Sequence, residues 1–146
     1  MREIFFEIVE LEAKTYHPLI MADFAGLYDH WWVIDTGASK SVFDESLTDC
    51  YMLNEEETVM ATGLGKEVVE TNSGTIPALK LGGFNFGPLP VALVDFSHIN
   101  NEYTKFSDKK IVGLIGCDFL YSRNAILNFE HHTLLLATEI FHNSTI

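Results

Sequence analysis

The chain has 146 residues and an acidic composition, with 21 Asp and Glu against 9 Lys and Arg and a formal net charge of −12. This length predicts a single domain, 1–146, with one core. The sequence contains no basic run. Because phosphate backbones are bound by clustered Lys and Arg, we do not expect nucleic acid as a partner.

Residues 1–10 include acidic side chains and lack the apolar core of a signal peptide. No later stretch reaches the ~18 consecutive apolar residues of a membrane span. We therefore expect a cytoplasmic protein that has no membrane partner. Cys50 and Cys117 form no paired motif, which favours two free thiols in a reducing compartment.

The N-terminal part of the chain predicts strands. Residues 4–11 alternate apolar and acidic side chains, which is typical of a strand exposed on one face. Pro18 is expected to end this strand, and residues 19–24 to begin another. A turn at 25–29 leads into a third strand at 31–35, which would form a hairpin with the second.

The most informative motif ends that third strand. Residues 31–34 are aromatic and β-branched, which predicts a strand covered on both faces, and Asp35 follows at once in the run Asp35-Thr36-Gly37-Ala38-Ser39. Gly37 permits a tight loop and the close approach of another backbone or a substrate. Two interpretations remain open. Asp35 caps a loop, or it activates water beside a second acid with which it shares a proton.

The middle of the chain predicts further short elements. Ser39 or Ser41 is a candidate cap for a short helix at 40–47. Three strands are expected at 67–71, 75–81 and 88–94, with turns at 72–74 and 82–83. Residues 97–108 are polar and indicate a loop or short helix. We interpret it as a solvated surface segment, with a wall of a substrate groove as the alternative.

A second glycine-containing segment runs from Ile111 to Leu120, where two apolar pairs are each closed by a glycine before a short helical start. At this point the chain resembles the retropepsin-like aspartic proteases, meaning the retroviral enzymes and their bacterial relatives. In that family an Asp-Thr-Gly-Ala loop is crossed by such a segment, which here contains Leu114, Ile115, Gly116, Asp118 and Leu120. Residues 60–69 resemble the family's flap hairpin, and residues 125–129 and 134–136 its closing strands.

The resemblance covers roughly residues 18–138 and leaves 1–17 as an N-terminal strand extension. It implies an all-β fold, a closed, barrel-like single lobe with one or two short helices. Two-lobed aspartic proteases carry two Asp-Thr/Ser-Gly loops, and this chain has one. The resemblance therefore implies a homodimer in which each Asp35 supplies half of a catalytic dyad.

The resemblance also implies the roles of single residues in an aspartic endopeptidase. The dyad would activate water, Thr36 would steady the two loops across the dimer axis, and the Gly37 carbonyl would receive the substrate backbone. Further contacts to a peptide are expected at Ala38, Ser39, Thr62, Gly63, Leu64 and Gly65. Because such a dyad titrates as a pair, activity should be bell-shaped in pH and centred below neutral.

Two positions depart from the family pattern. Ser39 stands where members commonly have Asp, so the contact with the end of the substrate is not carried over. Lys66 replaces the glycine that is usual at the flap tip, which stiffens the tip or brings a positive charge toward the groove.

Other chemistries find little support in the sequence. His131 and His132 are adjacent, so on a strand they point to opposite faces, and the remaining histidines show no ligand spacing. We expect no metal and no cofactor. The sequence contains no Gly-x-Ser-x-Gly motif and no pattern that pairs a cysteine with a histidine. The competing hypothesis is a catalytically silent module that keeps the Asp35 loop but only dimerises or binds peptides.

Overall fold

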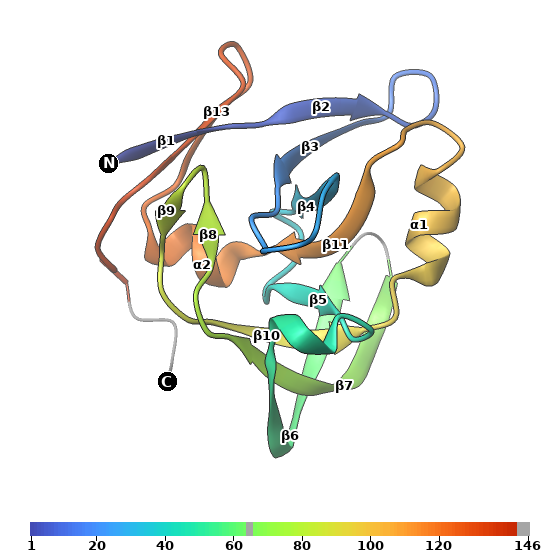
Figure 1. Ribbon diagram of the computed structural model, residues 1–146. Coiled ribbons are helices and arrows are strands. Elements are labelled where there is room, and N and C mark those ends of the chain that lie inside the picture. Colours follow the sequence, from blue (N-terminus) through green and yellow to red (C-terminus); the bar gives the residue numbers. More distant parts are fainter. Residues whose placement is uncertain (64–65, 143–146) are drawn as a thin grey trace.

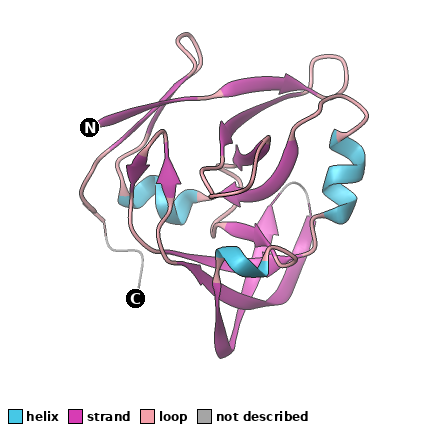
Figure 2. Cartoon of the chain, in the orientation of Figure 1, coloured by secondary structure: helices cyan, strands magenta, loops and turns pink. Residues whose placement is uncertain are grey.

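The computed structural model describes residues 1–63 and 66–142, and the side chains of 55–63 and 66–70 are outside the description. Strands dominate this part of the chain (Figures 1 and 2). The strands are β1 (Arg2–Phe5), β2 (Glu7–Glu10), β3 (Tyr16–Met21), β4 (His30–Ile34), β5 (Val42–Asp44), β6 (Met52–Gly63), β7 (Lys66–Ile76), β8 (Lys80–Leu81), β9 (Phe84–Asn85), β10 (Leu89–Val94), β11 (Lys110–Ile115), β12 (Ile126–Asn128) and β13 (Thr133–Leu136). The helices are α1 (Ser97–Tyr103), α2 (Cys117–Ser122) and the 3-10 turn η1 (Thr48–Cys50).

Strand β4 lies inside the main sheet, whose order is β2-β3-β4-β11-β5-β10-β7-β6. Its side chains alternate between two apolar clusters: Trp31 and Val33 pack on one face, and Trp32 and Ile34 on the other. All four are at least 94% buried. The prediction of a strand covered on both faces is confirmed, and the expected hairpin is the antiparallel pair β3–β4.

The N-terminal segment differs from the prediction at two points. The expected strand at 4–11 is divided into β1 and β2, which belong to different sheets. Pro18 does not end a strand but lies within β3, opposite Ile8 of β2. Pairing between β3 and β4 begins only at Leu19, so Pro18 has a strand on one side alone, where a missing N–H is tolerated.

The helix predicted at 40–47 is wrong, because residues 42–44 form strand β5. This short strand pairs with β10 on one side and with β11 on the other. Val42 and Phe43 are therefore buried from both sides, and a β-branched and an aromatic side chain suit that position. Helical spacing with Leu47 was coincidental, since Leu47 lies in the turn before η1.

The turn predicted at 72–74 is also wrong, because β7 runs through these residues. Ser73 and Gly74 pair with β6 on one side and with β10 on the other. Ser73 is buried, and its hydroxyl accepts a hydrogen bond from Asn54 Nδ2. The turn predicted at 82–83 is confirmed, since these glycines join β8 to β9.

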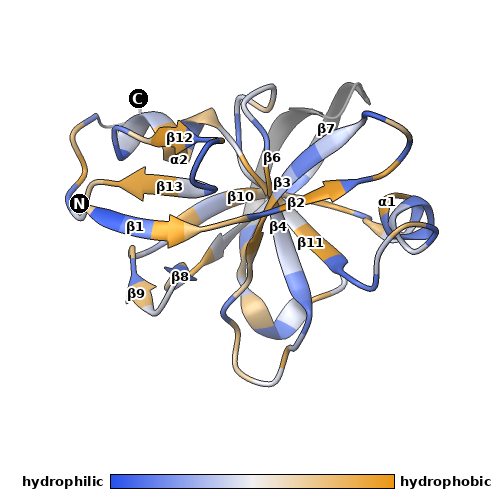
Figure 3. Cartoon of the chain, turned by 90° about the horizontal axis from the view of Figure 1, so that it is seen from above, coloured by the Kyte–Doolittle hydropathy of each residue, from blue (hydrophilic) through white to orange (hydrophobic). Residues whose placement is uncertain are grey.

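The all-β class is confirmed, whereas the closed barrel is not. Strands β2 and β6 are the two edges of the main sheet, and no pairing joins them among the described residues. A separate sheet, β1-β13-β12, contains the predicted closing strands and lies at the opposite end of the molecule from α1 (Figures 1 and 3). Neither α-helix of the described residues has the length and apolar character needed to cross a membrane.

The close contact between β11 and β4 gives a stability prediction at Gly113. A Cβ atom there would lie 2.4 Å from both a ring carbon of Trp32 and the carbonyl oxygen of Val42. Gly113→Ala should therefore lower the free energy of unfolding by about 3 kcal/mol in urea denaturation. Gly83→Ala is the control, because it meets open space at φ +80° and should cost only about 1 kcal/mol. A loss at Gly113 no larger than at Gly83 would contradict this packing.

Candidate active site

The Asp35 loop begins where β4 leaves the sheet. The Asp35 amide still donates to the Ile115 carbonyl at 2.9 Å, which extends the pairing with β11 by one residue. The loop then folds back on itself. Asp35 Oδ1 accepts the Gly37 amide at 2.9 Å, and the Asp35 carbonyl accepts the Ala38 amide at 3.1 Å. The carboxylate is thus fixed by its own backbone at the end of a buried strand.

The second carboxylate oxygen of Asp35 differs from the first in its hydrogen bonding. Oδ2 is buried and has no hydrogen-bond partner within the part of the chain that the structure describes. Leaving a buried polar atom unpaired costs roughly 1–3 kcal/mol and is usually explained by function or by a group outside the chain. Thr36 and Gly37, directly beside it, are exposed. The unpaired oxygen therefore lies beside an exposed part of the loop.

The segment after β11 crosses the Asp35 loop, as the family resemblance implies. The Cys117 amide donates to the Ala38 carbonyl at 2.8 Å, and Cys117 Sγ lies 3.1 Å from the Thr36 carbonyl. At Gly116 a Cβ atom would come within 2.8 Å of the carbonyl oxygens of Ala38 and Lys40. Only glycine permits this crossing, because the two backbones touch.

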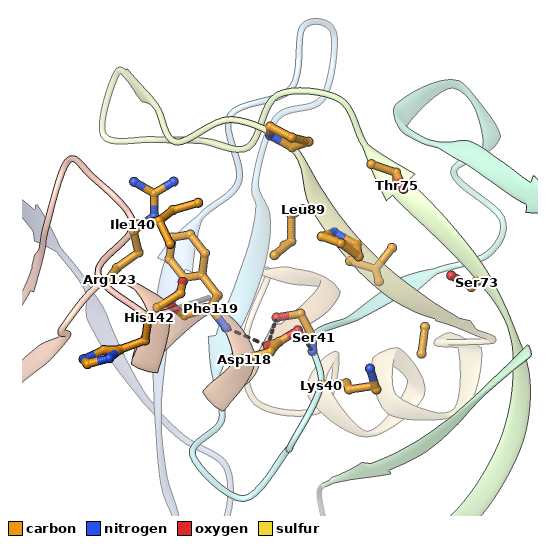
Figure 4. A pocket seen from close by; sticks show the side chains of 15 residues that line it. Lys40, Ser41, Ser73, Thr75, Leu89, Asp118, Phe119, Arg123, Ile140 and His142 are labelled. Carbon is orange, nitrogen blue, oxygen red and sulfur yellow. Dashed lines mark hydrogen bonds between the residues drawn. The ribbon is translucent and has the colours of Figure 1, made fainter. Parts of the chain in front are cut away.

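Asp118 joins the crossing to the strand that follows the Asp35 loop. Its Oδ1 accepts the Ser41 hydroxyl at 2.8 Å and its Oδ2 accepts the Ser41 amide at 3.0 Å (Figure 4). Ser41 Oγ in turn accepts the Gly116 amide at 3.0 Å, and Ser41 is fully buried. This network fixes the loop from behind. The sequence placed Asp118 in the motif but predicted Ser41 only as a possible helix cap.

The predicted site residues differ in their exposure and in how much of them the structure describes. Ala38 is fully buried, whereas Ser39 is exposed beside Thr36 and Gly37. Of the flap hairpin expected at 60–69, residues 60–63 lie in β6 and residues 66–69 in β7, and these strands pair antiparallel up to Gly63 with Lys66. Thr62 and Gly63 end β6, with the Thr62 side chain outside the description, and Leu64 and Gly65 are outside the described residues.

Two cavities lie near the loop. A small apolar cavity of about 280 Å³ adjoins Thr36 and is lined by Ile34, Thr36, Cys117, Leu120, Tyr121, Ala125, Leu127 and Leu134. A cavity of about 460 Å³ lies beyond Ser41 and Asp118 and reaches Arg123 and the chain near Ile140 (Figure 4). None of residues 35–39 lines this larger cavity.

The Arg123 guanidinium donates hydrogen bonds to the carbonyls of Phe86, Ala137 and Thr138, which indicates a structural role.

A polar pair that the sequence did not predict joins β3 to α1. His17 Nδ1 of β3 is hydrogen-bonded to the Tyr103 hydroxyl of α1. Burial lowers the pKa of His17, while the negative charge of Asp35 acts in the opposite direction. Burial and Asp35 together raise the pKa of Tyr103. The interpretation of 97–108 as solvated is thus wrong for Tyr103, which is 2% exposed.

The described residues contain no group of three or more His, Cys, Asp or Glu arranged to hold a metal ion. Cys50 and Cys117 are free thiols.

Comparison with protein families gives one match, which covers the Asp35 loop and the segment that crosses it. A family model described as aspartyl protease matches residues 20–119, from β3 through the start of α2. The chain therefore belongs to the aspartyl protease family, in its retropepsin-like branch, as the sequence resemblance indicated. Comparison with the curated proteins and with the solved structures gave no match.

The Ser41–Asp118 network predicts an order of stabilities. Asp118→Ala leaves the buried Ser41 amide and hydroxyl without their acceptor and should lower the free energy of unfolding by about 2–3 kcal/mol. Asp118→Asn keeps one acceptor oxygen and should lose less. Asp95→Ala, which removes an exposed bond to the Ser97 amide, is the control and should cost less than Asp118→Ala. Chemical denaturation of the three variants tests the order, and equal losses at Asp118 and Asp95 would refute it.

Proposed function

We propose that this protein is an aspartic endopeptidase that acts as a homodimer, with Asp35 of each chain forming the catalytic dyad. The observation that carries the proposal is the state of the Asp35 carboxylate. One oxygen is fixed by the loop, and the other is buried without a partner among the described residues. A second Asp35 sharing one proton with the first is a partner that satisfies this oxygen.

The chemistry follows from that arrangement. Two carboxylates about 3 Å apart cannot both ionise, so one carries a proton and the other is charged. The charged carboxylate takes a proton from water, which attacks the scissile carbonyl carbon. The shared proton passes to the carbonyl oxygen, and protonation of the leaving nitrogen completes cleavage. Asp35, Thr36 and Gly37 are the catalytic loop in this proposal.

Dimerisation is supported by the surface near the loop. The apolar cavity beside Thr36 gives a second copy a place to pack. Both edges of the sheet β1-β13-β12 also carry exposed apolar residues, with Phe5 69% and Ile126 53% exposed. Two chains of net charge −12 repel each other, but salt screens that repulsion beyond about 8 Å.

A peptide substrate would bind in an extended form between the catalytic loop and the β6–β7 hairpin. Strand-like binding supplies main-chain hydrogen bonds, and closure of a hairpin excludes water from the reaction. We propose substrate contacts at Ser39, Thr62, Gly63, Leu64 and Gly65, and an indirect role for Ala38. For Ala38 the side chain is buried and the carbonyl accepts the Cys117 amide, so its contribution is to the shape of the loop.

The test is cleavage of a mixed peptide library by the wild type and by Asp35→Asn. The amide cannot act as the charged base, so we expect cleavage to fall by 10³-fold or more, on the order of the loss seen for essential catalytic groups. Asp23→Asn changes an exposed carboxylate outside the loop and should cleave like the wild type. Mass spectrometry of the products gives the rates, and pepstatin should inhibit both active proteins.

Two results would count against the proposal. Cleavage that survives Asp35→Asn would remove Asp35 from the mechanism. Binding of peptides by the folded wild type without any cleavage would establish the silent peptide-binding module in place of the protease.

A further inference from the structure

The larger cavity, of about 460 Å³, is walled by continuations of the two elements that flank the proposed substrate groove. The catalytic loop continues into Lys40 and Ser41, and both residues line the cavity. Ser73 and Thr75 of β7, the second strand of the hairpin, line it as well. In Figure 4 these two residues lie at the opposite end of the cavity from Arg123. The cavity therefore extends both walls of the proposed groove beyond the catalytic loop.

Hydrogen bonds hold the polar side chains of this cavity in place. Ser41, which is fully buried, donates to Asp118 through both its amide and its hydroxyl. Across the cavity, Asn54 Nδ2 donates to Ser73 Oγ at 2.9 Å, and Thr75 Oγ1 donates to Asn54 Oδ1 at 3.2 Å. A polar wall that is already ordered loses little conformational freedom when a ligand binds.

The charges of the cavity include one cation without a partner among the described residues. Arg123 donates to three carbonyl oxygens, and Asp118 accepts from Ser41 and from the Phe119 amide. The ammonium of the exposed Lys40 has neither an ion pair nor a hydrogen bond within the part of the chain that the structure describes. Two positive side chains, Lys40 and Arg123, thus face a single carboxylate, Asp118. The cavity has an excess of positive charge in a chain whose net charge is −12.

The rest of the cavity wall is largely apolar. Leu89 and Val91 of β10 and Phe119 of α2 line it, and each is at least 95% buried. Such a wall suits methylene groups better than a fully hydrated ion. An acidic side chain combines the two chemistries, since its carboxylate can reach the Lys40 ammonium while its methylene groups contact β10.

We propose that this cavity is a specificity site for an acidic side chain of the peptide substrate, and that Lys40 binds its carboxylate. The inference rests on the proposed function, because it assigns the cavity to the substrate of the same enzyme. The Lys40 ammonium donates charge-assisted hydrogen bonds to the carboxylate. None of residues 35–39 lines the cavity, so the site selects the substrate without touching the reacting atoms.

The proposed homodimer has two such cavities, related by its two-fold axis. This axis passes between the two Asp35 residues, so one cavity lies on each side of the scissile bond. An extended peptide therefore meets one Lys40 before the bond and another after it. We expect Asp or Glu to be favoured at one position on each side.

The first measurement is the residue preference of cleavage in a mixed peptide library, for the wild type, Lys40→Glu and the control Lys14→Glu. Lys14 is an exposed lysine between β2 and β3, so its variant changes the net charge equally. The wild type should show a kcat/KM about threefold higher for Asp or Glu than for Asn or Gln at the two positions, the size expected for an exposed ion pair. Lys40→Glu should reverse this preference in favour of Lys and Arg, and Lys14→Glu should keep it. A wild type without acidic preference, or the same preference in Lys40→Glu, would overturn the inference.

The second measurement needs no cleavage. Asp35→Asn is titrated with the capped peptide acetyl-Glu-Glu-Glu-amide and, as a control, with acetyl-Gln-Gln-Gln-amide, while the amide NMR signals of Ser41, Ser73 and Thr75 are followed. Both peptides lack free termini, so only side-chain carboxylates distinguish them. The glutamate peptide should shift these signals, and Lys40→Met added to Asp35→Asn should abolish the shifts. Equal shifts with both peptides, or none with either, would refute the inference.

The two measurements separate the inference from the function on which it rests. Cleavage that depends on Asp35 but shows no acidic preference leaves the protease standing and removes only the role of Lys40. A wild type that cleaves no peptide counts against the protease, while the NMR titration still decides whether the cavity binds acidic side chains.

Discussion

The contact between two backbones at Gly116 is the constraint on which the site depends. The Asp35 loop and the segment after β11 cross so closely that a single Cβ atom at Gly116 would meet the carbonyl oxygens of Ala38 and Lys40. Hydrogen bonds stabilise the crossing: the Cys117 amide donates to the Ala38 carbonyl, and Ser41 donates to Asp118. The two segments begin at the ends of the paired strands β4 and β11. The sheet therefore holds the backbone of Asp35, and with it the carboxylate, in a fixed position.

This rigid support explains how one carboxylate oxygen can remain buried without a partner. A flexible loop would turn Oδ2 toward water, whereas here the Gly37 amide and the Ile115 carbonyl fix the residue at both its side chain and its backbone. Preorganised groups cost no rearrangement at the moment of reaction, which is the usual source of catalytic power. In the proposed dimer the same rigidity presents two carboxylates to each other at a fixed separation.

The sequence predicted the elements whose signals are local. The unbroken apolar run before Asp35 predicted β4 correctly, and the helical start expected after the two glycine-closed pairs is α2. The predictions from sequence were wrong where pairing with distant segments determines the secondary structure. Val42 and Phe43 have helical spacing with Leu47, yet pairing with β10 and β11 makes them a strand. Propensity is a weak guide when burial from both sides outweighs it.

The same limit applies to the site. Asp35, Thr36 and Gly37 were found because they are contiguous in a motif. The Ser41–Asp118 bonds join residues 77 positions apart, and the His17–Tyr103 bond joins residues 86 positions apart. No pattern in one sequence connects such pairs, because only the fold places them together. The polar character of 97–108 even suggested solvent for Tyr103, which is buried in the apolar cluster that contains Trp31 and Val33.

The central claim is that each chain supplies half of one active site, and mixed dimers test it most directly. Wild-type chains are incubated with increasing amounts of Asp35→Asn chains until subunits have exchanged, and cleavage is measured per wild-type chain. The account predicts that activity per wild-type chain falls in proportion to the fraction of wild-type chains whose partner is also wild type. Activity per wild-type chain that stays constant at every mixing ratio would contradict it, because each Asp35 would then act alone.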